Sequence, residues 1–168
     1  MATVNDSMLE KPGVKELLEV LGQCGQVVSA FLKPKPPVRP RFQEDHPLVD
    51  LFDSKAFQEA AVSLGQVSST LGRYSTLNRL EFEGSLVSVV LQGGCHRATT
   101  GMPVEVARAL VLRALEEAFP EPFSDVHVFR LDAEAWCQLT NEATVSISYV
   151  VWQSARGLWW VLCMADFD

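Results

Sequence analysis

The chain has 168 residues, of which 48% are hydrophobic and 21% charged, and its formal net charge is −7. This composition is typical of a globular protein with one buried core and excludes a largely disordered chain. A net negative chain repels phosphate backbones, so we expect no nucleic-acid-binding function. The start, MATVNDSMLEKPG, lacks the features of a signal peptide, and no apolar run reaches the about 18 residues of a membrane span. We therefore expect one cytoplasmic domain over residues 1–168 that does not contact a membrane.

The first predicted element is a helix over residues 11–32. Pro12 suits its first turn, and apolar residues recur at the three- and four-residue spacing of an amphipathic helix. They are Val14, Leu17, Leu18, Leu21, Cys24, Val28, Phe31 and Leu32. The pattern therefore places one helix before the rest of the core.

The next ten residues, KPKPPVRPRF (33–42), contain four prolines and four basic residues. Proline fixes extended backbone and removes an amide donor, so we expect a basic, Pro-rich strap that crosses the surface. Within it, PKPPVR also fits the P-x-x-P-x-R pattern that domains of the Src-homology-3 type bind, with Arg39 as the orienting cation.

The remaining core is predicted over residues 53–168. A second helix is expected to begin at Asp53 or Ser54 and to end at Gly72. Residues 78–92, NRLEFEGSLVSVVLQ, are predicted as strand. They form either one strand with a bulge at Gly84 or, as we slightly prefer, a hairpin that turns there.

A third helix is predicted from Pro103 to Ala118, followed by a strand over 125–132 and a short helical turn near 133–141. Two strands joined by SARG (154–157) form the final hairpin. Because helices and strands are partly segregated along the chain, we expect an α+β domain. It has a mostly antiparallel sheet of about four to six strands, with helices packed on one face.

A possible site lies in the segment LQGGCHRATTGMPVE (91–105), which leads from a predicted strand into the third helix. Its glycine spacing does not fit a phosphate-binding loop, but Arg97 is a candidate anion-binding residue at a helix start. Cys95 is a candidate nucleophile, because a nearby helix start lowers a thiol pKa, and its candidate base is His127 or His46. The alternative is that this segment has only a structural role, as a turn with a buried cysteine.

The four cysteines are Cys24, Cys95, Cys137 and Cys163, and none forms a C-x-x-C pair with another. Metal sites usually need closely spaced Cys and His ligands, so we predict no metal and no cofactor. Scattered cysteines without a secretion signal are typical of reduced thiols in the cytoplasm.

The four tryptophans fall in the last third of the chain, at Trp136, Trp152, Trp159 and Trp160. Neighbours on a strand face opposite sides, so Trp159 and Trp160 cannot enter the same core. Ser146 and Ser148 indicate a partly wet face on the preceding strand. We expect either simple packing of a large sheet or a binding face built from Tyr149, Trp152 and one of the indoles Trp159 and Trp160.

These patterns favour a non-catalytic binding or regulatory protein, in the manner of an inhibitor, immunity factor or chaperone. It would recognise a partner protein through an aromatic sheet face or its acidic surface, and it could form a homodimer. One alternative is a small-ligand pocket walled by tryptophans, in which Arg97 or Arg130 holds an anion. The other is a small cysteine-dependent enzyme that uses Cys95 and His127.

Overall fold

The computed structural model describes residues 3–68, 73–93, 101–120, 123–131 and 136–167. In these ranges the strands form one antiparallel sheet of six members in the order β1-β2-β6-β5-β4-β3. They are β1 (Thr3–Val4), β2 (Gln26–Lys33), β3 (Tyr74–Leu77), β4 (Val126–Leu131), β5 (Val145–Gln153) and β6 (Leu158–Asp166). The predicted α+β class with an antiparallel sheet is confirmed.

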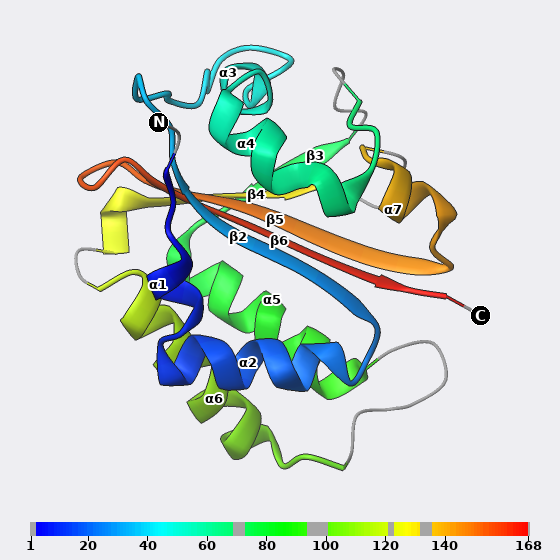
Figure 1. Ribbon diagram of the computed structural model, residues 1–168. Coiled ribbons are helices and arrows are strands. Elements are labelled where there is room, and N and C mark those ends of the chain that lie inside the picture. The colour runs from blue at the N-terminus through cyan, green and yellow to red at the C-terminus, as the bar shows by residue number, and fades with distance from the viewer. Residues whose placement is uncertain (1–2, 69–72, 94–100, 121–122, 132–135, 168) are drawn as a thin grey trace.

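Helices cover both faces of this sheet (Figure 1). One side, which we call the helix face, carries α1 (Asp6–Leu9), α2 (Pro12–Gly22), α5 (Arg79–Gln92) and α6 (Val104–Ala118). The opposite side, the strap face, carries α3 (Val49–Phe52), α4 (Lys55–Ala60), the 3-10 turn Ala61–Leu64 and α7 (Gln138–Glu142). The predicted one-sided arrangement therefore describes the three long helices, whereas short helices cover the strap face. Within the described ranges, no helix has the length and apolar character needed to cross a membrane.

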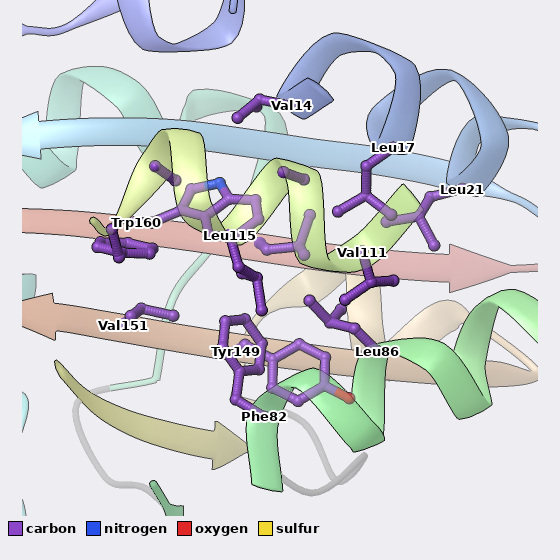
Figure 2. Packing of buried hydrophobic residues seen from close by; sticks show 14 of the residues in the cluster. Val14, Leu17, Leu21, Phe82, Leu86, Val111, Leu115, Tyr149, Val151 and Trp160 are labelled. Carbon is purple, nitrogen blue, oxygen red and sulfur yellow. The ribbon is translucent and has the colours of Figure 1, made fainter. Parts of the chain in front are cut away.

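The core on the helix face packs α2, α5 and α6 against the odd-numbered residues of β5 and the even-numbered residues of β6. Figure 2 shows Leu17 and Leu21 of α2, and Val111 and Leu115 of α6, in one cluster with Tyr149, Val151 and Trp160 of the sheet. The regular apolar spacing in α6 explains why this helix could be predicted; it begins at Val104, and Pro103 is the N-cap residue before it.

A second core fills the strap face. Phe57 packs on Phe52, which in turn stacks on Trp136. Trp152 and Trp159 lie against each other on the sheet, with ring centroids 5.9 Å apart. The strap (33–42) leaves the end of β2 and joins this layer through Val38, which is half-buried against it.

The predicted helix over residues 11–32 is wrong beyond Gly22. The chain turns at Gln23–Gly25 and then forms β2, which pairs with β6 from Gln26↔Ala165 to Leu32↔Trp159. Gly25 explains the change of structure, because a Cβ there would lie 2.7 Å from the Ala165 carbonyl oxygen. A β-branched pair, Val27-Val28, follows and favours the strand.

The predicted strand or hairpin at 78–92 is also wrong, because these residues form α5. The Asn78 side chain accepts hydrogen bonds from the backbone N–H groups of Leu80 and Glu81, and the Glu81 carboxylate accepts one from the Asn78 N–H. This reciprocal cap satisfies the helix start. Packing of Phe82, Leu86 and Val90 against the sheet and α6 then outweighs the strand preference of the sequence SLVSVV.

The remaining predicted elements agree more closely with the structure. Ser54 caps α4 by accepting a hydrogen bond from the Phe57 N–H, although the α-helix ends at Ala60 and Gly72 lies outside the described residues. Strand β4 and the β5–β6 hairpin lie where they were expected, and α7 occupies the predicted helical turn.

Candidate functional site

The aromatic residues predicted to share one binding face lie on opposite faces of the sheet. Tyr149 and Trp160 belong to the core of the helix face, whereas Trp152 and Trp159 belong to that of the strap face. The reason is the two-residue period of a strand, which separates position 149 from 152 and position 159 from 160. All four side chains are buried, so none offers an open contact surface as the sequence suggested.

On the helix face the two aromatic residues serve packing. Trp160 stacks on Phe31 with ring centroids 5.0 Å apart, and its Nε1–H donates a 2.8 Å hydrogen bond to Ser29 Oγ. The Tyr149 hydroxyl lies 2.5 Å from Ser85 Oγ of α5, and burial raises the pKa of the Tyr149 phenol. These contacts hold α5 against the sheet and join the side chains of β2 and β6.

On the strap face the serine at position 148 is buried rather than wet. It accepts a 3.0 Å hydrogen bond from the Nε1–H of Trp136. The Nε1–H groups of Trp152 and Trp159 are buried too, yet they have no hydrogen-bond partner in the part of the chain that the structure describes. Unpaired buried donors carry a desolvation cost of about 1–3 kcal/mol each, so the strap face holds polar groups that packing alone does not explain.

An aromatic cluster reaches the surface at the β4 end of the strap face. The ring of Phe42, the last residue of the strap, lies 5.0 Å from His127, 6.1 Å from Phe129 and 5.9 Å from Trp152. Phe42 is 51% exposed, while Phe129 and Trp152 below it are buried. The strap thus places an accessible aromatic ring over the predicted aromatic part of the sheet.

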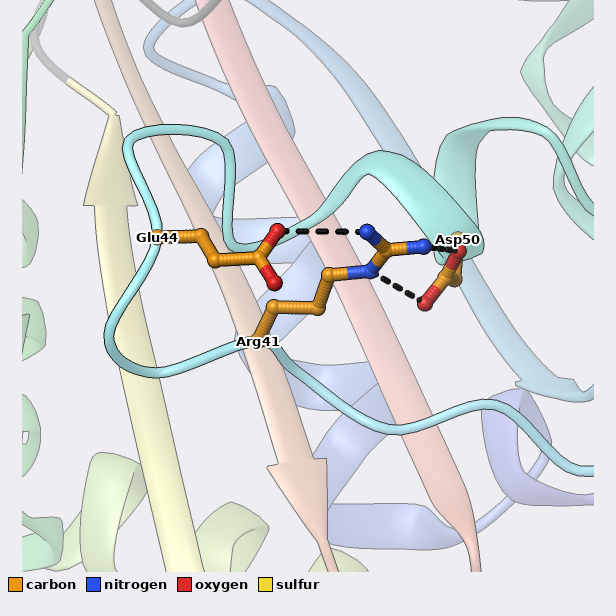
Figure 3. Close-up of polar contacts among 3 residues, drawn as sticks. All are labelled: Arg41, Glu44 and Asp50. Atoms are coloured by element: carbon orange, nitrogen blue, oxygen red, sulfur yellow. Dashed lines mark hydrogen bonds and ion pairs between the residues drawn. The ribbon is translucent and has the colours of Figure 1, made fainter.

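Phe42 is held in place by its neighbour, Arg41. The Arg41 guanidinium donates two hydrogen bonds, of 2.8 and 2.7 Å, to the carboxylate of Asp50 and one of 3.2 Å to Glu44 (Figure 3). The Arg41 N–H also bonds to the Pro47 carbonyl, which closes the loop. The hydrogen bonds from Arg41 lower the pKa of Asp50. Water and salt screen exposed ion pairs, so this anchor orients the loop more than it stabilises the fold.

A groove of about 500 Å³ opens beside this ring, and we call it the Phe42 groove. Phe42 forms one wall and Phe123, which is 41% exposed, forms another. The remaining lining comes from the ends of β3 and β4 and the start of α5: Thr76, Leu77, Asn78, Glu81, Ser124, Val126, His127, Val128 and Phe129. The groove is therefore mostly apolar, with a few polar groups at its rim.

The wall at Phe123 covers a buried cation. The guanidinium carbon of Arg79 lies 4.9 Å from the centre of the Phe123 ring, and Arg79 Nη1 donates a 3.0 Å hydrogen bond to Glu83. This stacking holds the exposed ring of Phe123 at the groove, because a guanidinium is attracted to an aromatic face.

The Phe42 groove also contains a free strand edge. Strand β3 pairs with β4 only from Leu77↔Val128 to Tyr74↔Leu131, and the chain then turns away at Asn78 into α5. Val126 and His127 consequently have no strand neighbour on that side in the described ranges. An unpaired edge offers backbone donors and acceptors to another extended chain.

The candidate catalytic residues do not form a described site. Cys95 and Arg97 lie outside the described residues. His127 lies on the strap face, with its ring among Phe42 and Trp152, whereas Gly93 lines a cavity with Arg130 at the other end of β4. Among the described residues no three His, Cys, Asp or Glu side chains gather as metal ligands would.

That second cavity measures about 190 Å³ and lies between the end of α5 and the strands β5 and β6. Arg130 and Asp166 line it, together with Gln92, Ser146 and apolar residues. None of the four tryptophans is among its lining residues, contrary to the predicted tryptophan wall.

Sequence reasoning missed Phe42 and Phe123 as candidate site residues. The sequence offered only a weak signal for them, because each is a single aromatic residue within two positions of a proline, in RPRF and PEPF. Comparisons of the chain with models of protein families, with curated proteins and with solved structures find no match.

Proposed function

We propose that the protein is a non-catalytic binding protein that holds an extended segment of a partner protein in the Phe42 groove. The observation that carries this proposal is the coincidence of two features in one place. Exposed aromatic walls stand beside a strand edge where Val126 and His127, which pair with β5 on one side, have no described strand on the β3 side. Edge pairing supplies affinity through backbone hydrogen bonds, and an adjacent pocket supplies specificity by accepting a side chain.

The lining of the groove and the charge of the whole chain indicate which kind of partner segment would bind. The lining favours an apolar or aromatic anchor between Phe42 and Phe123. The net charge of −7 favours a segment with basic residues beside that anchor, because opposite charges accelerate association. A cytoplasmic location is part of the proposal, since Cys24, Cys137 and Cys163 are free thiols.

The test uses a display library of random peptides selected on the wild-type protein. Peptides of the proposed kind should lose about tenfold or more in affinity on Phe42→Asp and on Phe123→Asp, because a charge in either wall opposes an apolar anchor. Leu112→Asp is the matched control: it alters another half-exposed apolar residue, but on α6 on the opposite side of the sheet. Affinity is measured by calorimetry, and the bound residues are mapped by NMR shifts.

The proposal is wrong if the selected peptides bind all three variants equally well. It is also wrong if the shifted NMR signals come from α2 and α6 rather than from β3 and β4. Circular dichroism of each variant separates a lost contact from a lost fold.

The other edge of the sheet supports self-association as part of the same proposal. β1 pairs only with Leu32 and Lys33, so residues Gln26–Ala30 of β2 have no strand partner in the described chain on the side away from β6. This stretch, QVVSA, carries no charge, and most natural edge strands are protected by charges or prolines. Two copies could pair β2 with β2 about a two-fold axis.

Sedimentation equilibrium up to millimolar concentration should therefore show a monomer–dimer equilibrium. Val28→Lys should shift it toward monomer, because a lysine at the edge opposes strand pairing. The control Val62→Lys places the same charge at an exposed residue away from the edge. A wild-type protein that stays monomeric throughout the range would refute β2 self-association.

A small-ligand function has one observation in its favour, which is the cavity beside Arg130. Its wall contains both a guanidinium and the carboxylate of Asp166, so it suits a small polar molecule with groups of both charges. A screen of amino-acid-like ligands by NMR tests this alternative, with shifts expected at Ser146 and Ile147 rather than at His127.

A further inference from the structure

Two buried thiols meet between α7 and the sheet. Cys137 is the residue just before α7, Cys163 lies in the middle of β6, and both belong to the core of the strap face. The two side chains lie within hydrogen-bonding reach of each other, where α7 contacts β6. Positions 137 and 163 are far apart in the sequence, so tertiary structure brings the two cysteines together.

Trp136 fixes this juxtaposition. Its Nε1–H donates to Ser148 Oγ at 3.0 Å, and Ser148 lies directly opposite Cys163 in the β5–β6 ladder. On the other side, the Ser68 N–H donates to the Trp136 carbonyl at 2.7 Å. Hydrogen bonds from the side chain and to the backbone carbonyl of Trp136 therefore hold the backbone around Cys137 beside Cys163.

The two sulfurs have different surroundings. The sulfur of Cys137 accepts from the backbone N–H of Thr140 at the start of α7, and Thr140 Oγ1 lies 3.5 Å from this sulfur. The bond from the Cys163 thiol and these donors lower the pKa of Cys137, while the bond to Cys137 and burial raise the pKa of Cys163. One sulfur is thus suited to attack and the other retains its proton.

A surface cavity of about 320 Å³ lies close to the pair. It is lined by Phe52, Phe57, Val67, Ser68 and neighbouring residues, and Val67 forms a single β-bridge with Cys137. The segment Gln66–Ser68 thus lies between this cavity and the Cys137 backbone, to which it is joined by the bridge and by hydrogen bonds of 2.8 and 2.7 Å on either side of it. A small neutral oxidant needs only a local opening of this segment to reach Cys137.

We propose that Cys137 and Cys163 form a reversible disulfide in the folded protein when it is exposed to hydrogen peroxide. The pair is an oxidation site independent of the Phe42 groove. It joins the start of α7 covalently to the middle of the sheet.

The chemistry balances with peroxide as the only oxidant. The Cys137 thiolate attacks one peroxide oxygen, so that an S–O bond forms, the O–O bond breaks, and hydroxide leaves and takes up a proton as water. The Cys163 sulfur then attacks the resulting sulfenic acid. An S–S bond forms, the S–O bond breaks, and a second water leaves with the Cys163 proton. Two thiols and one peroxide give one disulfide and two waters.

The test uses the full chain with Cys24→Ser and Cys95→Ser, which retains only the proposed pair. After treatment with hydrogen peroxide at neutral pH, intact-mass spectrometry should show the loss of two hydrogen atoms. Non-reducing peptide mapping should show one cross-link, between Cys137 and Cys163, and dithiothreitol should remove it. Adding Cys163→Ser should replace the cross-link by oxygen uptake at Cys137.

Peptide mapping of the peroxide-treated wild-type protein provides a second measurement that does not depend on these variants. There the same cross-link is expected, and a cross-link of Cys137 to Cys24 or Cys95 instead would overturn the proposal. Oxygen uptake without a cross-link in the double-serine protein, or a cross-link that forms only in urea, would overturn it as well.

Discussion

Replacement of Trp160 by alanine is expected to lower the free energy of unfolding by about 3–5 kcal/mol, the range for truncation of a buried tryptophan. Trp160 is fully buried, stacks on Phe31 and meets the rings of Phe82 and Phe119 at centroid distances of 6.1 and 6.0 Å. Its removal leaves a cavity where α5, β2 and the chain after α6 converge. The loss is measured from urea unfolding curves as a lower midpoint with an unchanged slope.

Trp159 provides the matched comparison, because it is equally buried on the other face of the same strand. Trp160→Phe removes the donor that bonds to Ser29, whereas Trp159→Phe removes an N–H that has no partner among the described residues. The volume lost is the same, so Trp160→Phe should be the more destabilising change by about 1 kcal/mol. Equal losses would contradict the assigned role of the Ser29 hydrogen bond.

Replacement of Gly25 by alanine is expected to lower the free energy of unfolding by about 1–3 kcal/mol, the usual cost of overpacking. The new methyl group would lie 2.7 Å from the Ala165 carbonyl oxygen and 3.2 Å from its carbon. Both atoms belong to the backbone of β6 and cannot move aside as a flexible side chain would. Thermal and urea unfolding of the variant measure the loss.

Gly84→Ala is the control and should have the opposite sign. Gly84 lies inside α5, and a methyl group there meets no described atom within 4 Å beyond the backbone of its own helix. Alanine should therefore stabilise the protein by about 1 kcal/mol through its higher helix propensity. A destabilised Gly84→Ala protein would contradict helix α5 and return the hairpin to consideration.

The sequence predicted those elements whose own pattern agrees with their tertiary surroundings. Helix α6 has an apolar stripe that the core needs, and the β5–β6 hairpin combines β-branched residues with a short polar connection. The prediction for residues 78–92 was wrong because their β-branched residues locally favour a strand. Packing against α6 and the sheet stabilises the helix α5 instead. The Asn78-x-x-Glu81 spacing was the available signal for that helix.

The candidate site was less predictable than the fold. Trp152 does belong to an aromatic cluster on the sheet, but its exposed member, Phe42, comes from a strap whose path no local pattern specifies. The pairing of β5 with β6 places Tyr149 and Trp160 together on the helix face, and the sequence alone does not give this pairing. The thiol pair depends in the same way on a contact between α7 and β6 that sequence spacing cannot reveal.

The position of β6 between β2 and β5 has a consequence for how the chain folds. Strand β2 comes early, yet its neighbour in the sheet begins only at Leu158, so their contacts span more than a hundred residues, as the 131-residue separation of Ser29 and Trp160 shows. Contacts so distant in sequence close large loops, which slows folding. During synthesis the segment Gln26–Ala30, which carries no charge, has no β6 to pair with until the final hairpin has been made. In that interval this segment is the part of the chain most exposed to wrong pairing, and chaperone binding there would protect it.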